Sequence, residues 1–324
     1  MLNDPSLRMV AVVPTIDVEN LRRAIPWLST LLQHGVVPMV AANSVATTAE
    51  ALPAGFLRSS DGTNGGFARS VNRGARDAGD WDWVVLLNDD LQLTEDAVIA
   101  MVSAMRDGRS DQPELLMFDP EPPRRIPSSG EALLGLSLIY DVPGRLRRSP
   151  VPADANEGPL PSGMFKSFSA VAINRASWDR IGTLSERFLF CYEDVEYQRR
   201  VAARRGSVLA VPVAIEHNRS KSTKSRIRLV LPAIAESATA YAQISGIPGP
   251  VARALAVVTL LARVPFVFVS SAPRGEHLRG IATSIRLAVT GAPAALPPFD
   301  PSGAAEAVRE TEGTRQLNRS RNSS

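Results

Sequence analysis

Two neighbouring carboxylates follow an apolar run, and they are the first residues whose types and spacing could do chemistry. Residues Val84–Leu87 are all apolar, Asn88, Asp89 and Asp90 come next, and apolar residues then resume. A carboxylate held at the end of a buried strand can offer oxygen ligands to Mg²⁺ or Mn²⁺, which need few protein ligands when substrate phosphates complete the shell. The alternative is a turn stabilised by Asn and Asp side chains. The motif predicts Asp90 as a metal ligand, with Asp89 beside it or capping the turn.

A glycine-opened segment, "DGTNGGFARSVNRG", is the second candidate. Gly65 and Gly66 stand where a loop enters a helix, and the free N–H groups at such a point favour an anion or a nucleotide. Asn64 and Asn72 could donate hydrogen bonds to a base or a ribose. The segment is neither a Walker loop nor a dinucleotide fingerprint, and a plain turn with asparagine on the helix surface is the alternative.

Adjacent acids in "FLFCYEDVEYQRR" form the third candidate. An aromatic and apolar run delivers Glu193 and Asp194 to the start of a predicted helix. Acids at a helix N-terminus are stabilised by the helix dipole, which is a sufficient reason for their presence. The same dipole keeps a carboxylate ionised, which suits a general base. Glu196 and Arg200, further along, could brace the helix start.

His217 ends a predicted strand, Ser207–His217, and is one of three histidines in the chain. A lone histidine is more often a surface or core residue than a ligand, but in company with Asp90 it becomes a candidate for a further metal ligand. The basic run that follows carries five positive charges and no negative one. It is either a solvated loop or a site where Arg219 and Lys221 hold a diphosphate or an acceptor phosphate.

The pattern of elements predicts how these residues are positioned. Strands are expected at Met9–Val13, Val36–Ala42 and Trp83–Asn88, and helices at Glu19–Gln33, Gly65–Gly79 and Thr94–Met105. Such alternation implies right-handed crossovers and an α/β fold, a Rossmann-like, mostly parallel sheet flanked by helices. Ligands bind outside the carboxyl ends of strands in such sheets, where Asn88, Asp89 and Asp90 are expected.

Composition divides the chain into three parts. Residues 1–225 are predicted to form one catalytic-size domain, made of a first half (1–118), a loop or lid with nine prolines (119–161) and a second half (162–225). Residues 226–291 have helical patterns and form a C-terminal helical extension. Residues 292–324 are polar and rich in small residues, which predicts a disordered tail.

Charge and cysteine usage narrow the class and the compartment. The 324 residues include 36 basic and 33 acidic ones, and the net charge of +3 is too small to imply a nucleic-acid partner. A single cysteine, Cys191, excludes an internal disulfide framework and fits a reducing compartment, and the first ten residues lack a secretory pattern. The apolar stretch Val251–Ala272 is interrupted by Arg253 and Arg263. We therefore expect a cytoplasmic protein whose apolar stretch packs on the protein or lies on the inner face of the plasma membrane.

In this order and spacing, the four candidate segments resemble the inverting family 2 glycosyltransferases with the GT-A fold, especially the rhamnosyltransferase-like branch. The segment "NGGFARSVNRG" resembles N-x-G-F-a-x-x-x-N-x-G, and "LLNDDL" resembles the L-N-x-D form of the acidic metal motif. The segment "FLFCYEDVEYQRR" resembles F-F-x-Y-x-E-D-x-D-L-x-x-R, and "IEHNRSKS" resembles a late H-x-x-x-x-S element. The resemblance covers Met9 to Ser222, and the set is specific although each member alone is weak.

The resemblance implies roles for individual residues. Asp90 is similar to the metal-binding aspartate, with His217 near metal and diphosphate, and Asp194 is similar to the general base, with Glu193 beside it. The resemblance assigns nucleotide binding to the glycine loop and its neighbours: Asn64, Gly65, Gly66, Asn72, Asn88 and Asp89. The implied reaction uses Mn²⁺ or Mg²⁺ and moves a sugar from dTDP-rhamnose or a UDP-sugar to a cell-envelope glycan or glycolipid.

Departures from the family pattern keep other readings open. Ala42 stands where the family has an aspartate that holds the base, and Asp17 or Asp61 could compensate. Glu196 replaces the second acid of the E-D-x-D element, and Cys191 replaces a tyrosine. One alternative is a catalytically impaired module that binds a nucleotide or a sugar. Another is that the C-terminal half is a membrane-surface or partner-binding scaffold.

Overall fold

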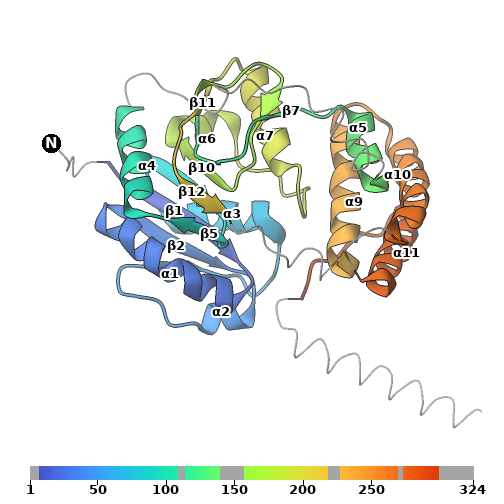
Figure 1. The fold of residues 1–324 in the computed structure, drawn as a ribbon, viewed down its shortest axis with the longest axis horizontal. Helices are drawn as coiled ribbons and strands as arrows, with labels where there is room; N and C mark the ends of the chain where they lie inside the picture. The colour runs from blue at the N-terminus through green and yellow to red at the C-terminus, as the bar shows by residue number, and fades with distance from the viewer. Residues whose placement is uncertain (1–6, 109–113, 139–156, 218–226, 269–272, 299–324) are drawn as a thin grey trace, which may run out of the picture.

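The computed structural model describes residues 7–108, 114–138, 157–217, 227–268 and 273–298, and an eight-stranded sheet forms its centre (Figure 1). The strand order is β3-β2-β1-β4-β10-β6-β11-β8. These strands are β1 (Met9–Thr15), β2 (Val36–Ala42), β3 (Leu57–Ser59), β4 (Trp83–Leu87), β6 (Leu115–Met117), β8 (Gly158–Pro159), β10 (Ala170–Asn174) and β11 (Val208–Ala210).

Strand directions decide where the candidate residues meet. Strands β1 to β4 are parallel to one another, and β6 and β11 run in the same direction, whereas β10 is antiparallel to both of its neighbours, β4 and β6. The carboxyl ends of β1, β4 and β6 therefore lie at the same edge as the beginning of β10. This edge is where ligands bind in open α/β sheets.

Alternating residues of the strands fill two cores. Met9, Ala11 and Val13 of β1 join a core covered by α1 (Val18–Gln33) and α4 (Glu95–Asp107). Val10 and Val12 point to the other face, which is covered by α3 (Gly66–Asp77), α6 (Arg175–Ile181) and α7 (Glu193–Ala203). Both faces of the sheet are buried, which explains why its strands are apolar throughout. The predicted fold class, a mostly parallel α/β sheet flanked by helices with a helical C-terminal extension, is confirmed.

The predicted strand Ser207–His217 is in fact two strands in two sheets. Strand β11 ends at Ala210, and β12 (Ile215–His217) pairs antiparallel with β5 (Leu91–Leu93) in a separate two-stranded sheet. Pro212 lies in the gap, and proline has no N–H to donate to a strand ladder. The break turns the chain so that His217 comes opposite Leu91.

The proline-rich segment is only partly a loop. Residues 119–138 contain β7 (Arg124–Arg125), which pairs with β9 (Met164–Phe165), and α5 (Ser129–Leu134) followed by a short 3₁₀ turn. Ser128 and Glu131 form a capping box at the start of α5. This S-x-x-E signal is visible in the sequence, so the expectation of an irregular loop was wrong for this part. Residues 139–156 of the predicted lid lie outside the described residues.

Three helices form the C-terminal extension, at the end of the molecule opposite α1 and α4 (Figure 1). They are α9 (Ile227–Ile244), α10 (Gly249–Arg263) with a 3₁₀ turn to Phe268, and α11 (Arg274–Thr290). Gly249–Phe268 is long and apolar enough to cross a membrane by length and composition, and 33% of it is buried inside the protein. A small helix, α2 (Val45–Ala49), completes the described helices.

The predicted disordered tail begins in the structure as an extended segment with fixed contacts. Residues 292–298 run back from α11 toward the N-terminal end of α3 (Figure 1). We call residues 292–298 the strap. Residues 299–324 lie outside the described residues.

Candidate functional site

Asp89 ties the end of β4 to the neighbouring strand and helix. Its carboxylate accepts hydrogen bonds from the Thr15 hydroxyl at 2.6 Å and from the Asn20 amide at 3.3 Å. Burial raises the pKa of Asp89 to about 6, although the Thr15 bond works in the opposite direction. Asp89 is therefore a positioned carboxylate, and its role is more than a local turn cap.

Asp90 and His217 contact each other directly. Nε2 of His217 lies 3.2 Å from Oδ1 of Asp90, and the two side chains are 16% and 14% exposed. The hydrogen bond that His217 donates to the Asp90 carboxylate raises the pKa of His217, while burial opposes the rise. Strand pairing explains the contact, because β5 follows Asp90 directly and His217 pairs with Leu91. The predicted partnership of Asp90 and His217 is present in the geometry.

The donor set of this pair fits a divalent cation that keeps open coordination positions. A carboxylate and an imidazole converge on one point, and both are ligands of Mn²⁺. Within the described residues no group of three or more His, Cys, Asp and Glu side chains could hold a metal ion. A cation at Asp90 and His217 would therefore need oxygen atoms from substrate phosphates or water to complete its shell.

Asp194 begins α7 in a strongly constrained turn. Cys191 and Tyr192, just before the helix, both adopt left-handed backbone conformations, with φ of 67° and 73°. The Asp194 carboxylate accepts a hydrogen bond from the Val195 N–H at 2.8 Å and another from the Phe168 backbone. Burial nevertheless raises the pKa of Asp194. A carboxylate held by N–H groups with a raised pKa is suited to accept a proton near neutral pH.

Glu193 differs from its neighbour because it faces inward. Its side chain is buried, and among the described residues its Oε2 atom has no hydrogen-bond partner. Burial, and then the charge of Asp194, raise its pKa. Glu193 therefore holds its proton more firmly than an exposed glutamate does, and Asp194 is the better placed of the two to act as a base.

Two residues before β10 link the acid pair of α7 to the acids after β4. Phe168 bonds to Asp194, and the carbonyl oxygen of its neighbour Ser169 accepts a hydrogen bond from the N–H of Asn88 at 2.9 Å. Asn88 thus uses its backbone here. The structure therefore brings Asp90, His217 and Asp194 to the same edge of the sheet.

Sequence reasoning missed Asp119 and Lys166. Asp119 follows β6, is buried, accepts a hydrogen bond from the Ser169 hydroxyl, and its charge raises the pKa of His217. Burial lowers the pKa of Lys166, which the charge of Asp119 partly offsets. The run "LLMFD" carries the same signal as "VVLLND", an acid directly after a buried strand, and could have identified Asp119.

The glycine loop is built for close approach of backbones. Asn64 accepts a hydrogen bond from the Gly66 N–H at 3.3 Å and donates one to the Pro297 carbonyl at 2.7 Å. Gly66 has a φ of +83°, and a Cβ atom there would lie 2.6 Å from the Leu189 carbonyl oxygen. Only glycine fits this position. Beside it, a Cβ on Gly65 would meet the side chain of Arg69.

Asn72, unlike Asn64, is bonded to the segment that precedes α7. Its amide donates to the Leu184 carbonyl and to Glu186, both at 2.9 Å, and its oxygen accepts from the Leu184 N–H at 3.0 Å. These bonds fix α3 to the segment before α7. In this structure Asn72 therefore supports the site and does not line it with Asn64.

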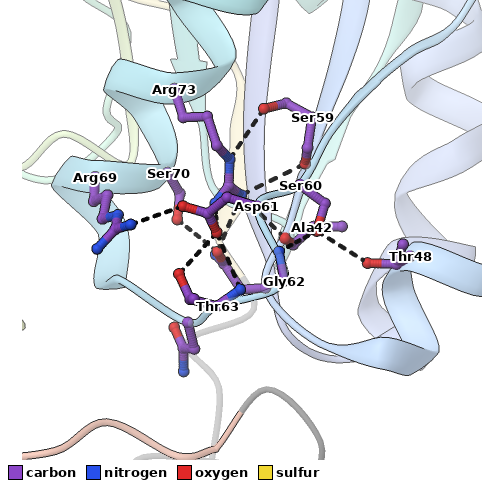
Figure 2. Close-up of polar contacts among 12 residues, drawn as sticks. Ala42, Thr48, Ser59, Ser60, Asp61, Gly62, Thr63, Arg69, Ser70 and Arg73 are labelled. Atoms are coloured by element: carbon purple, nitrogen blue, oxygen red, sulfur yellow. Dashed lines mark hydrogen bonds and ion pairs between the residues drawn. The ribbon is translucent and has the colours of Figure 1, made fainter.

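The buried Arg73 of α3 joins the end of β2 to the loop that precedes α3 (Figure 2). Arg73 donates to the Ala42 carbonyl at 3.0 Å and pairs with Asp61 at 2.6 Å. Burial would raise the pKa of Asp61, but hydrogen bonds from Thr63 and the charge of Arg73 outweigh burial and lower it. Asp61 is thus a fixed anion close to the end of β2. Asp17, the other proposed substitute, instead caps α1.

A pocket lies between the end of β4 and the loop before α3, and the strap lines part of it. It is lined by Thr15, Asn43, Asn64, Gly66, Asp89 and Phe190, together with Leu296 and Pro297. Arg219 and Lys221, the predicted cationic contacts, lie outside the described residues.

Comparisons with known proteins add little to this geometry. Neither protein-family profiles nor curated protein sequences gave a match. Among solved structures the chain is similar to S. aureus TarS 1-349, with 12% sequence identity and a TM-score of 0.42, over 87% of this chain and 81% of that one.

Proposed function

We propose that the protein is an inverting, metal-dependent glycosyltransferase. It would move a sugar from a nucleotide donor, dTDP-rhamnose or a UDP-sugar, to a hydroxyl group of a cell-envelope glycan or glycolipid. The observation that supports this best is the shared sheet edge of Asp90, His217 and Asp194, beside a pocket that reaches Asn64 and Gly66. The free Cys191 fits a cytoplasmic reaction.

The proposed transfer divides the work between the two acid pairs. Asp194 accepts the proton of the acceptor hydroxyl as its oxygen forms a bond to the anomeric carbon of the donor. The bond from that carbon to the diphosphate oxygen breaks on the opposite face, so the configuration inverts and a nucleoside diphosphate leaves. A divalent cation held by Asp90 and His217 would supply charge neutralisation for the diphosphate. Asp89, fixed by Thr15, positions its neighbour.

Calorimetry tests the metal-dependent part of this proposal. UDP and dTDP are titrated with and without Mn²⁺ into the wild-type chain, into Asp90→Asn, and into Asp96→Asn, an exposed acid on α4 that serves as the control. We expect Mn²⁺-dependent binding by the wild type and the control, and a loss in Asp90→Asn. Undiminished Mn²⁺-dependent binding by Asp90→Asn would contradict the site.

Ala42 favours a second candidate, a nucleotide- or sugar-binding module without catalysis. Where the resemblance calls for an acid, this chain has Ala42, with Arg73 and Asp61 already paired beneath it. Such a module would bind the donor and release neither transfer product nor hydrolysed sugar. Slow Mn²⁺-dependent hydrolysis of the donor by the wild type, absent in Asp194→Asn, would decide for the enzyme.

A further inference from the structure

The outer surface of the C-terminal helices carries a continuous apolar face. Every exposed residue between positions 250 and 268 is apolar, and the largest of them lie on one side of α10 and its 3₁₀ extension: Val251, Leu255, Val258, Leu261 and Phe268. Val258 and Phe268 are each 61% exposed. The face is about 27 Å long at 1.5 Å per residue, too large and too ordered to be scattered surface residues.

Exposed arginines lie beside this apolar face. Residues 249–291 contain five arginines and one glutamate, of which Arg263 is buried and Arg279 pairs with Glu276 at 2.7 Å. Arg274 stacks over Phe268 at 5.7 Å from the ring centre, so the charge begins where the apolar face ends. Arg279 and Arg286 are exposed on the adjacent α11, together with Leu278 and Val289. Apolar side chains flanked by arginines match a surface of anionic lipid.

A buried arginine excludes the transmembrane alternative for this helix. Arg263 of α10 donates to the Leu136 carbonyl in the 3₁₀ turn after α5 at 2.9 Å and to His277 of α11 at 2.7 Å. A helix crossing a bilayer would lose these partners and leave a charge in hydrocarbon. A second copy of the chain is also disfavoured, because a twofold contact would bring the same arginines together.

We propose that the exposed face of α10 and the arginines of α11 dock the protein on an anionic membrane surface. The helix lies in the plane of the headgroups, with its apolar side chains inserted and its buried side packed on α9 and α11. This docking does not depend on the proposed reaction, although it would bring the enzyme to a lipid-linked acceptor.

Vesicle flotation of the full chain tests the docking. We use phosphatidylcholine vesicles with and without phosphatidylglycerol, and compare the wild type with Leu255→Glu/Val258→Glu and with Ile99→Glu. Ile99 is an equally apolar, 40% exposed residue on α4, at the far end of the molecule (Figure 1). We expect binding to anionic vesicles by the wild type and Ile99→Glu, and at least a tenfold loss in the double variant.

A second double variant provides the test if Leu255→Glu/Val258→Glu is unstable. Arg274→Gln/Arg279→Gln leaves the apolar side chains intact, and we expect it to weaken binding to anionic vesicles several-fold. Three results would overturn the proposal. The wild-type protein does not bind anionic vesicles, or it resists extraction at high salt and alkaline pH as an integral membrane protein does, or it forms a dimer through Leu255.

A different observation, the strap, carries a second inference, which rests on the proposed function. The strap makes two contacts with the glycine loop and one with α9. Pro297 accepts the amide of Asn64 at 2.7 Å, a methyl group of Leu296 lies 3.0 Å from the position of a Cβ on Gly66, and Glu236 of α9 accepts the Ala294 N–H. Leu296 and Pro297 line the same pocket as Thr15 and Asp89.

These contacts use the groups that a nucleotide would need. The Asn64 amide is a donor suited to a ribose or base, and it is already bonded within the chain. We infer that the strap occupies the donor pocket of the empty protein and must move aside when a nucleotide binds. The apparent affinity for the nucleotide is therefore lower, because only the fraction of molecules with the strap displaced can bind it.

Two neutral substitutions in the full chain test this competition. Leu296→Ser removes the side chain that lies over Gly66, and Ala295→Ser changes its exposed neighbour as a control. We expect the affinity for UDP or dTDP with Mn²⁺ to rise about fivefold in Leu296→Ser and to stay unchanged in Ala295→Ser. Equal or weaker binding by Leu296→Ser would overturn the competition, whereas no binding by any of the three proteins would instead refute the proposed function.

Discussion

The site contains two pairs of adjacent acids, Asp89–Asp90 and Glu193–Asp194, whose surroundings differ. After β4, each carboxylate has a partner from another element: Thr15 and Asn20 bond to Asp89, and His217 pairs with Asp90. At the start of α7, Asp194 is bonded by backbone N–H groups, and Glu193 is buried with an unbonded oxygen. Side chains from other elements thus hold the first pair, whereas backbone N–H groups and burial surround the second. In the proposed reaction the first pair serves the cation and the second accepts the proton. The following changes test that contrast.

Asp194→Asn should have the largest effect, because it removes the proton acceptor and keeps the shape of the side chain. We expect the rate of sugar transfer to fall about 10²- to 10⁴-fold, with donor affinity within twofold of the wild type. Single-turnover assays with labelled donor measure the rate, and calorimetry measures the affinity. Equal losses of rate and affinity would show that Asp194 binds the donor and is not the base.

Asp90→Asn should reduce Mn²⁺-dependent donor affinity about 10- to 100-fold, because it removes one of the two proposed protein ligands. Binding without Mn²⁺ should change little. The contrast with Asp194→Asn is the informative result, since one variant loses affinity and the other loses rate. If both variants behave alike, the division between a cation-binding pair and a proton-accepting pair is wrong.

Thr15→Val should have a smaller effect through Asp89. Losing the 2.6 Å hydrogen bond removes about 1 kcal/mol of support for the charged form, so the pKa of Asp89 rises further. We expect donor affinity at pH 6.5 to fall about fivefold and to recover as the pH is raised. Thr30→Val, on the outer part of α1, is the control and should leave affinity unchanged.

Glu193→Gln should change stability more than activity. Because burial raises the pKa of Glu193, the folded state keeps a proton that the unfolded chain releases above about pH 4.3, so the folded state loses stability as the pH rises through that window. The substitution removes this loss. We expect no change in melting temperature at pH 4 and a gain of about 1 kcal/mol in unfolding free energy at pH 8.

Glu196→Gln is the matched control on the same helix. Glu196 pairs with Arg200 at 2.8 Å, so its substitution should lower the stability at neutral pH. A loss of stability in both variants would mean that Glu193 is ionised and paired in solution.

Local signals made much of the fold predictable. The apolar runs of β1, β2 and β4 and the Thr94 cap of α4 were identified from the sequence, because burial on both faces and helix capping leave local patterns. The split at Pro212 and the capping box at Ser128 also have local signals that were not used.

Contacts between distant segments could not be predicted in the same way. The two bonds from Asn72 to Leu184 and the bond from Asn64 to Pro297 join segments more than 100 residues apart, and no pattern in either segment encodes the other. The partnership of Asp90 with His217 was expected from their places at the ends of predicted strands and from the family resemblance. What places the two together is the pairing of β5 with β12, a tertiary event.

The geometry of the proposed cation site therefore depends on the register of this strand pairing. Asp90 and His217 stand at adjoining ends of a ribbon only three residue pairs long. A slip of two residues keeps every side chain on its face but shifts the imidazole by about 6.8 Å along the strand, beyond reach of the carboxylate. Substitutions that touch neither residue, such as proline at Gln92, should therefore abolish metal binding as completely as removing a ligand.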